Sequence, residues 1–186
     1  MKWRPRSDKR LWLFCDGSTG ALLPHNTGGA PPPTAKGAPV NLPTTCAAAA
    51  IAYDDQGRML DWSAQPLPTV TNNEAEYAGL LLGLALAQRW QATEARCVLD
   101  SEIVIGQMEG RFAVKSARLR HWHHQATLAV RALPLVRYVQ IPREWNRLAD
   151  GLAAQTALSW MALVERMRIE DGGERTEERG QRRENR

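Results

Sequence analysis

Two aspartates in this 186-residue sequence stand at the ends of short apolar segments. Asp16 follows the apolar run 11–15, and Asp100 ends the short segment that begins at Arg96. A carboxylate beside a buried segment is costly to desolvate unless something pairs with it. Sites in α/β proteins collect where strands end and helices begin, so neighbouring strands would bring these two carboxylates together. Taken singly, each aspartate could instead cap a turn or a helix.

The segment TNNEAEY adds two glutamates of different kinds. Thr71 and Glu74 have the spacing of a capping box, in which Thr71 bonds forward and Glu74 reaches back. This arrangement is worth about 1 kcal/mol and gives Glu74 a structural role. Glu76 has no such role, because it lies at the edge of the apolar surface of the predicted helix, one turn before Gly79. We therefore take Glu76 as a third candidate carboxylate.

The segment REWNRLADGLA supplies a fourth acid, Asp150. It lies among apolar residues of a predicted helix, with Asn146 one turn earlier on the same face. An aspartate in such surroundings is unfavourable unless it meets a cation. The alternative is an aspartate at the solvated edge of an ordinary amphipathic helix.

Several carboxylates held together repel one another, by about 1 kcal/mol for each pair 4 Å apart in water and by more in a less polar setting. Divalent cations remove this penalty, and Mg²⁺ suits a few carboxylates together with water and phosphate oxygens. Two such ions roughly 3.5–4 Å apart can activate a water molecule and stabilise the leaving oxygen of a phosphodiester. The pattern therefore predicts a metal site built from Asp16, Glu76, Asp100 and Asp150.

Hydrophobic periodicity predicts the elements that must position these acids. Strands are expected over residues 11–16, 45–53, 58–63, 96–100 and 135–141, and helices over 71–90, 101–109, 115–132 and 145–168. An antiparallel meander followed by alternating strands and helices gives an α/β fold with a mixed sheet flanked by helices.

The sequence predicts one catalytic domain with three additional segments. Residues 1–10 form an N-terminal extension, and the domain covers 11–168. A proline- and glycine-rich loop is inserted at 22–44. Residues 169–186 mix both signs of charge without an apolar residue after Ile169, which predicts a disordered tail.

Composition limits the classes of partner and indicates the cellular compartment of the protein. The net charge of +4 permits a polyanionic partner without requiring one. The cysteines, Cys15, Cys46 and Cys97, are odd in number and lie in apolar segments, which argues against a disulfide framework and indicates the reducing cytoplasm. No run has transmembrane length, so we expect no membrane partner, and we expect a monomer. Core packing is the default for the seven tryptophans, although Trp122 and Trp145 could stack on a nucleic acid.

Four segments together resemble type 1 ribonuclease H, in the compact subgroup that lacks the basic protrusion. They are CDGS, TNNEAEYAGLLLGL, VLDSEIVIGQMEGRFAVK and IPREWNRLADGLA, and they occur in the family's order. The resemblance implies a ribonuclease H-like fold with a five-stranded mixed sheet and helices on both faces. It also implies endonucleolytic hydrolysis of the RNA strand of RNA–DNA hybrids with two Mg²⁺ ions (or Mn²⁺), leaving 5′-phosphate and 3′-hydroxyl ends.

The same resemblance assigns roles residue by residue. The four acids match the family's metal ligands. Asn72 and Asn73 match positions that contact the hybrid in its minor groove, where amide side chains can sense the 2′-hydroxyl. The full set of positions on the substrate side is Gly17, Ser18, Asn72, Asn73, Ser101, Glu102 and Asn146.

Two features depart from the family pattern. Many members carry a histidine before the last helix, whereas the segment 137–146 has none, and Arg143 could there orient the scissile phosphate as a fixed cation. The insertion 22–44 is either a tolerated surface excursion or a source of contacts through His25 and Lys36. Two other functions stay open at this point: action on another substrate such as double-stranded RNA, and a non-catalytic hybrid-binding module.

Overall fold

The structure is a computed structural model that describes residues 9–20 and 45–184. The loop insertion 22–44, with His25 and Lys36, lies outside the described residues, and so does most of the N-terminal extension 1–10. The proposed contacts of that loop therefore stay a prediction. Within the described ranges, no helix is long and apolar enough to cross a membrane.

Five strands form one mixed sheet in the order β3-β2-β1-β4-β5. Their bounds are β1 Arg10–Thr19, β2 Cys46–Tyr53, β3 Met59–Leu67, β4 Glu94–Leu99 and β5 Val136–Gln140. The first three strands pair antiparallel as a meander, and β4 and β5 join β1 in parallel. This confirms the predicted five-stranded mixed sheet. The strand β1 continues to Thr19, past the predicted end at Asp16. Its parallel register with β4, which pairs Phe14 with Val98, places Asp16 beside Asp100 at the carboxyl end of β4.

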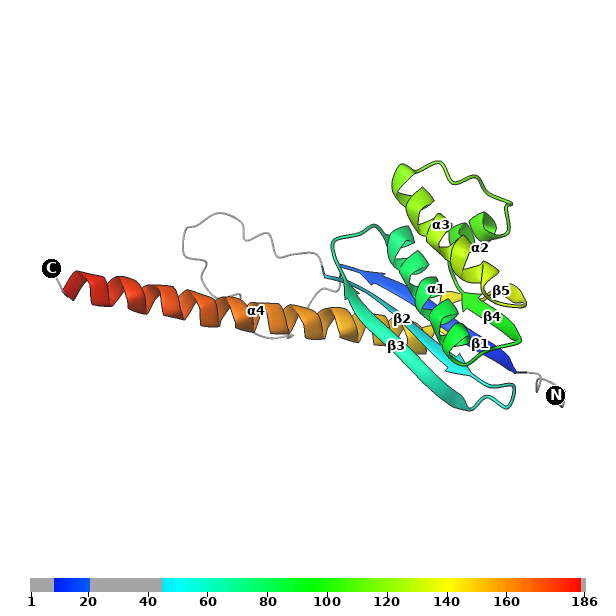
Figure 1. Ribbon diagram of the computed structural model, residues 1–186, viewed down its shortest axis with the longest axis horizontal. Helices are drawn as coiled ribbons and strands as arrows, with labels where there is room; N and C mark the ends of the chain where they lie inside the picture. Colours follow the sequence, from blue (N-terminus) through cyan, green and yellow to red (C-terminus); the bar gives the residue numbers. More distant parts are fainter. Residues whose placement is uncertain (1–8, 21–44, 185–186) are drawn as a thin grey trace, which may run out of the picture.

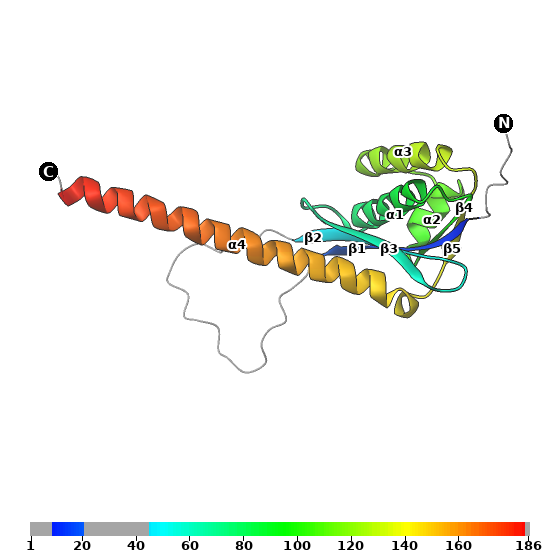
Figure 2. The ribbon, with the colours of Figure 1, turned by 60° about the horizontal axis from the view of Figure 1, so that its bottom comes forward.

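The helices cover both faces of this sheet. They are α1 Asn72–Arg89, α2 Glu102–Met108, α3 Ala117–Arg131 and α4 Arg147–Glu184, with a short 3₁₀ turn at Arg143–Trp145 before α4. Figure 2 shows α1, α2 and α3 on one face and α4 on the other. Figure 1 shows that α4 extends well past the sheet.

The length of α4 differs from the expectation. The sequence predicts a helix that ends at Arg168 and a disordered tail, whereas the structure continues the helix to Glu184. Arginine and glutamate are good helix formers and form favourable pairs one turn apart. The lack of apolar residues after Ile169 therefore removes a reason for this segment to pack on the sheet, but it does not prevent a helix.

Small residues let the layers approach closely. In β2, Ala47, Ala48, Ala49 and Ala50 are fully buried. The helix α4 packs on β1, β2 and β3, and it buries a stripe of three alanines, Ala149, Ala153 and Ala157. Because alanine side chains are short, the backbone of α4 lies close to the strand that carries Asp16.

On the other face, the backbones of α1 and β1 touch. A Cβ atom added to Gly17 would lie 2.0 Å from the carbonyl carbon of Ala75, and one added to Gly79 would lie 2.4 Å from the carbonyl oxygen of Asp16. No side chain fits between the two elements at these positions. This contact brings Glu76 of α1 beside Asp16 of β1.

We predict that Gly79→Ala destabilises the protein by about 1–3 kcal/mol, because the added methyl group meets backbone atoms that cannot rotate away. Gly151→Ala is the matched control, since Gly151 lies on an exposed part of α4 with open space around its Cα. The control should be stabilised by up to about 1 kcal/mol through helix propensity. Urea denaturation followed by circular dichroism measures both changes, and equal effects at the two sites would contradict the packing argument.

Candidate active site

Three of the four predicted acids converge at the end of the sheet where the parallel strand β4 finishes. Asp16 comes from β1, Glu76 from α1, and Asp100 from the residue after β4. One carboxylate oxygen from each lies within 4.8 Å of the others. These three residues are 60 and 24 positions apart in the sequence, and the fold brings them into one acidic cluster.

Two of these carboxylates are buried, that of Asp100 is half-buried, and each has a buried oxygen without a partner. Asp16 is 2% exposed and Glu76 is 5% exposed. Among the described residues, the buried side-chain oxygens without a hydrogen-bond partner include Asp16 Oδ2, Glu76 Oε2 and Asp100 Oδ1. Buried polar atoms in native proteins are nearly always satisfied, so these oxygens call for protons or for a cation. An all-oxygen set of this kind fits a hard divalent ion such as Mg²⁺ or Mn²⁺.

The pKa values of the cluster also indicate a site that needs protons or a cation. Burial, followed by the charge of Asp100, raises the pKa of Asp16 from 3.8 to about 7. Burial, followed by the charge of Asp16, raises the pKa of Glu76 from 4.5 to about 9. Without a cation, the cluster therefore holds protons near neutral pH, and a divalent ion would have to displace them.

Asp150, the fourth predicted acid, is placed differently. It lies in the first turn of α4, its side chain is 38% exposed, and its Oδ1 accepts a hydrogen bond from Arg143 Nη2 at 2.8 Å. Its negative charge helps to raise the pKa values of Asp16 and Glu76, whereas the charge of Arg143 lowers them. Asp150 thus borders the cluster, and it is already paired with a protein cation.

Asn146 corrects one expectation. The sequence analysis places it among the substrate contacts, but its side chain is 1% exposed. Its Nδ2 donates a hydrogen bond to the carbonyl oxygen of Cys15 at 2.9 Å. Asn146 therefore fastens the start of α4 to the strand immediately before Asp16. A side chain buried to this degree is also out of reach of a bound nucleic acid.

The other predicted substrate positions surround the same edge. Gly17 is buried beneath α1, whereas Ser18 and Asn73 are half-buried and Asn72 and Glu102 are exposed. Thr19, which the sequence analysis did not select, donates a hydrogen bond from Oγ1 to Asn72 Oδ1 at 3.5 Å and so links the end of β1 to the start of α1.

Two helix starts are fixed by their own side chains. Ser101 Oγ accepts a hydrogen bond from the backbone N–H of Val104 at 3.4 Å and caps α2. Glu74 accepts a hydrogen bond from the backbone N–H of Thr71 at 2.7 Å, which confirms its structural role. Glu74 also accepts from Arg118 Nε of α3 at 2.9 Å. Sequence reasoning missed Arg118 as a positioning residue, because nothing in local spacing links residues 44 positions apart.

The arrangement of sheet, helices and acidic edge is that of a ribonuclease H fold, and comparisons with solved structures agree. The N-terminal RNase H domain of Rv2228c from Mycobacterium tuberculosis is 28% identical, with a TM-score of 0.64 over 80% of this chain and 98% of that one. LC11-RNase H1, solved in complex with an RNA/DNA hybrid, is 24% identical and has a TM-score of 0.65 over 81% of this chain and 99% of that one. At this lower identity the second likeness concerns the fold alone.

The model of the family described as "Reverse transcriptase-like" matches residues 35–156, and the chain belongs to this ribonuclease H-like family. The Bifunctional protein Rv2228c of Mycobacterium tuberculosis is 39% identical over 99 residues, which is 53% of this chain and 27% of that protein. The match thus covers about a quarter of the length of that curated relative.

We predict that, without divalent metal, the melting temperature falls as the pH rises from about 5 to about 9. The folded pKa values of Asp16 and Glu76 lie above their ordinary values, so the folded state binds more protons than the unfolded chain in this range. The stability that these protonated carboxyls contribute is fully present below about pH 4 and is lost as the pH passes through about 7 and then about 9.

Differential scanning fluorimetry in EDTA measures this slope, and Glu76→Gln provides the comparison. The variant cannot ionise at residue 76, so its advantage in melting temperature over the wild type should grow with pH. Added Mg²⁺ should stabilise the wild type more at pH 9 than at pH 6, because the ion competes with protons for the same oxygens. A variant whose advantage stays constant across the range would contradict the assigned pKa shift.

Proposed function

We propose that the chain is a metal-dependent endoribonuclease that hydrolyses the RNA strand of RNA–DNA hybrids and leaves 5′-phosphate and 3′-hydroxyl ends. The observation that carries the proposal is the convergence of Asp16, Glu76 and Asp100, whose buried oxygens lack partners. Support comes from the RNase H domain of Rv2228c and from LC11-RNase H1, which was solved with an RNA/DNA hybrid.

The cluster suits two Mg²⁺ ions, with Mn²⁺ as an alternative. The ligands would be Asp16, Glu76 and Asp100, joined by Asp150 when it releases Arg143. When bound, such ions supply an activated water for in-line attack and neutralise the charge that develops on the leaving oxygen. The protein contributes the fixed spacing of the acids and the water-poor surroundings that strengthen their hold on a cation.

Arg143 takes the place of the missing histidine in this proposal. Its side chain is 73% exposed and reaches Asp150, and its charge acts on Asp16 and Glu76. A guanidinium stays protonated at any working pH and can bind two phosphate oxygens at once. We therefore assign Arg143 to orienting the scissile phosphate rather than to moving a proton.

The exposed residues at the same edge would read the substrate. Asn72, with the half-buried Asn73, Ser18 and Ser101, offers amide and hydroxyl groups that can bond to the 2′-hydroxyl. Glu102 lies beside them on the first turn of α2. An RNA–DNA hybrid is the proposed partner, and double-stranded RNA is the alternative that an assay on matched duplexes decides.

We further propose that the protein acts as a monomer in the cytoplasm. All four acids come from one polypeptide, so a monomer can hold a complete site. Cys15 and Cys97 are buried thiols, and reduced thiols are typical of the cytoplasm, where we place the activity.

We predict that Asp16→Asn and Asp100→Asn each reduce hybrid cleavage to less than about a tenth of the wild-type rate, because each removes a metal ligand. A gel assay in Mg²⁺ on end-labelled hybrid, RNA duplex and single strands measures both the rate and the substrate. Glu109→Gln is the control, since Glu109 is exposed and pairs with Arg111 away from the cluster. Melting in EDTA should show that both aspartate variants remain folded; cleavage above that level in either would count against the assignment.

We predict that Arg143→Ala lowers the cleavage rate by about tenfold or more, because a charged group at the reacting phosphate is lost. Arg143→Lys should restore part of the rate, since lysine keeps the charge but not the two-pronged geometry. The pH profile of the residual activity should keep its shape, as expected for a group that does not titrate. A change in that profile would instead indicate a proton-transfer role.

A further inference from the structure

A cavity of about 540 Å³ lies beside the active site, on the sheet face that α4 covers. Its lining includes Trp12 and Phe14 of β1, Tyr53 at the end of β2, and Trp145 and Leu148 at the start of α4. Phe14 and Tyr53 meet edge to face, with ring centroids 5.5 Å apart. The turn between β2 and β3 closes the far side. The volume is in the range of ligand sites. Four of the eight lining residues are aromatic, and Asp54, Asp55 and Gly57 of the turn complete the lining with Leu148.

The cavity adjoins the acidic cluster. Alternate residues of a strand face the same side, so Trp12, Phe14 and Asp16 share one face of β1, and Phe14 is only about 7 Å along the strand from Asp16. Trp145 stands two residues after Arg143 in the same 3₁₀ turn. Trp145 therefore lies next to the residue that we propose for the scissile phosphate.

Two large apolar side chains at the mouth of the cavity are open to solvent. Trp145 is 71% exposed and Leu148 is 68% exposed. Exposed apolar patches rimmed by polar residues mark binding surfaces. A tryptophan side chain in this position offers a flat face on which another ring can stack.

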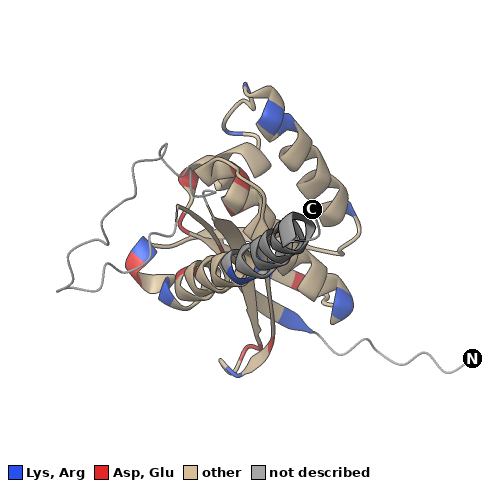
Figure 3. Ribbon diagram, turned by 90° about the vertical axis from the view of Figure 1, so that its left-hand side faces the viewer, with Lys and Arg blue, Asp and Glu red and all other residues tan. Residues whose placement is uncertain are grey.

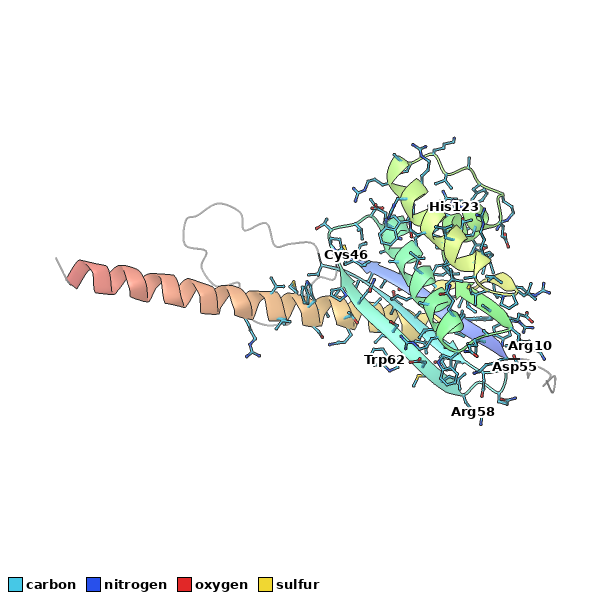
Figure 4. All side chains as sticks on the ribbon, viewed as in Figure 1. Arg10, Cys46, Asp55, Arg58, Trp62 and His123 are labelled. Atoms are coloured by element: carbon cyan, nitrogen blue, oxygen red, sulfur yellow. The ribbon has the colours of Figure 1, made fainter. Side chains whose placement is uncertain are left out.

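Two carboxylates line the cavity, and both are neutralised by ion pairs, so they do not repel a nucleic acid. The aspartates of the β2–β3 turn are paired: Asp55 with Arg10 at 3.2 Å, and Asp54 with Arg58 at 2.7 Å. Figure 4 shows Arg10, Asp55 and Arg58 gathered at this end of the molecule, and Figure 3 shows that basic and acidic residues adjoin at the turn.

Two paired arginines lie close to these lining residues. The Arg96 guanidinium lies 4.7 Å from the centroid of the Trp12 ring and pairs with Glu94 at 2.9 Å, and the Arg58 side chain, which pairs with Asp54, is 75% exposed. Aromatic rings interleaved with arginines are the features by which proteins bind single-stranded nucleic acid, since the rings stack on bases and the arginines hold phosphates.

We propose that this cavity binds an unpaired nucleotide of the strand that continues beyond the RNA–DNA hybrid, with Trp145 stacked on its base. Inside a duplex the faces of a base are covered by its neighbours, so only an unpaired base can enter the cavity. The exposed Arg58 beside the β2–β3 turn would hold an adjoining phosphate in exchange for Asp54. The inference rests on the proposed function for its substrate, and it assigns to the enzyme a preference for hybrids that border single-stranded nucleic acid.

The test compares blunt hybrids with hybrids whose DNA strand extends by five nucleotides at one end or the other. For the wild type, the KM for one of the extended hybrids should be lower than that for the blunt hybrid by about fivefold or more, as stacking of one base provides. Trp145→Ala should remove this difference, and Trp145→Phe should keep part of it. Trp62→Ala is the matched control, because Trp62 is 54% exposed on β3 and does not line the cavity.

A second measurement needs no cleavage. Quenching of tryptophan fluorescence by an eight-nucleotide single-stranded DNA should give a Kd that Trp145→Ala weakens by about fivefold or more and Trp62→Ala leaves unchanged. If blunt hybrids are cleaved but neither extension lowers KM, or if Trp145→Ala retains the effect, the cavity proposal is wrong. If no hybrid is cleaved, the proposed function fails instead, and the quenching experiment still decides whether the cavity binds an unpaired strand.

Discussion

The active site depends on one close contact, between the backbones of α1 and β1. Gly17 and Gly79 leave no space for a Cβ atom between the helix and the strand. The helix therefore sits deep enough on the sheet for Glu76 to reach Asp16. With one more layer of side chains between them, the two carboxylates would face each other across a packed core, and no cation could bind to both.

This contact holds like charges together, which opposes folding when no cation is bound. The rest of the structure offsets that repulsion by fixing each acid through a neighbour within four residues. Gly17 fixes Asp16 through its close contact with α1. Glu74 and Ser101 cap the helix starts next to Glu76 and Asp100. Asn146 ties the start of α4, which carries Asp150, to β1. Because the backbone is fixed around Asp16 and Glu76, burial and then the neighbouring negative charges raise the pKa values of these two carboxyls instead of moving the chain apart.

Sequence patterns were sufficient where the signal is local or periodic. The hairpin, the parallel strands and the capping role of Glu74 follow from turn residues, alternation and capping, and the structure agrees with each. The role of Glu76 as a metal ligand stays a prediction. Contacts over long distances in sequence were out of reach, such as Glu74 with Arg118 and Asn146 with the carbonyl of Cys15. Asn146 shows why: a polar residue one turn from an acid has the same spacing whether it faces the substrate or the core.

The site also combines a rigid part with an adjustable one. Asp16 and Glu76 are buried on the two elements that form the contact of α1 with β1, so they cannot move apart without disturbing it. Asp150 and Arg143 form an exposed ion pair at 2.8 Å, and such pairs contribute about 1 kcal/mol or less. A doubly charged cation attracts Asp150 more strongly than a single guanidinium does, and a phosphate offers Arg143 an equally good partner. On the proposed function, arrival of substrate and metal would therefore exchange both partners of this pair at little cost, and the same event would complete the acidic cluster and free Arg143 for the phosphate.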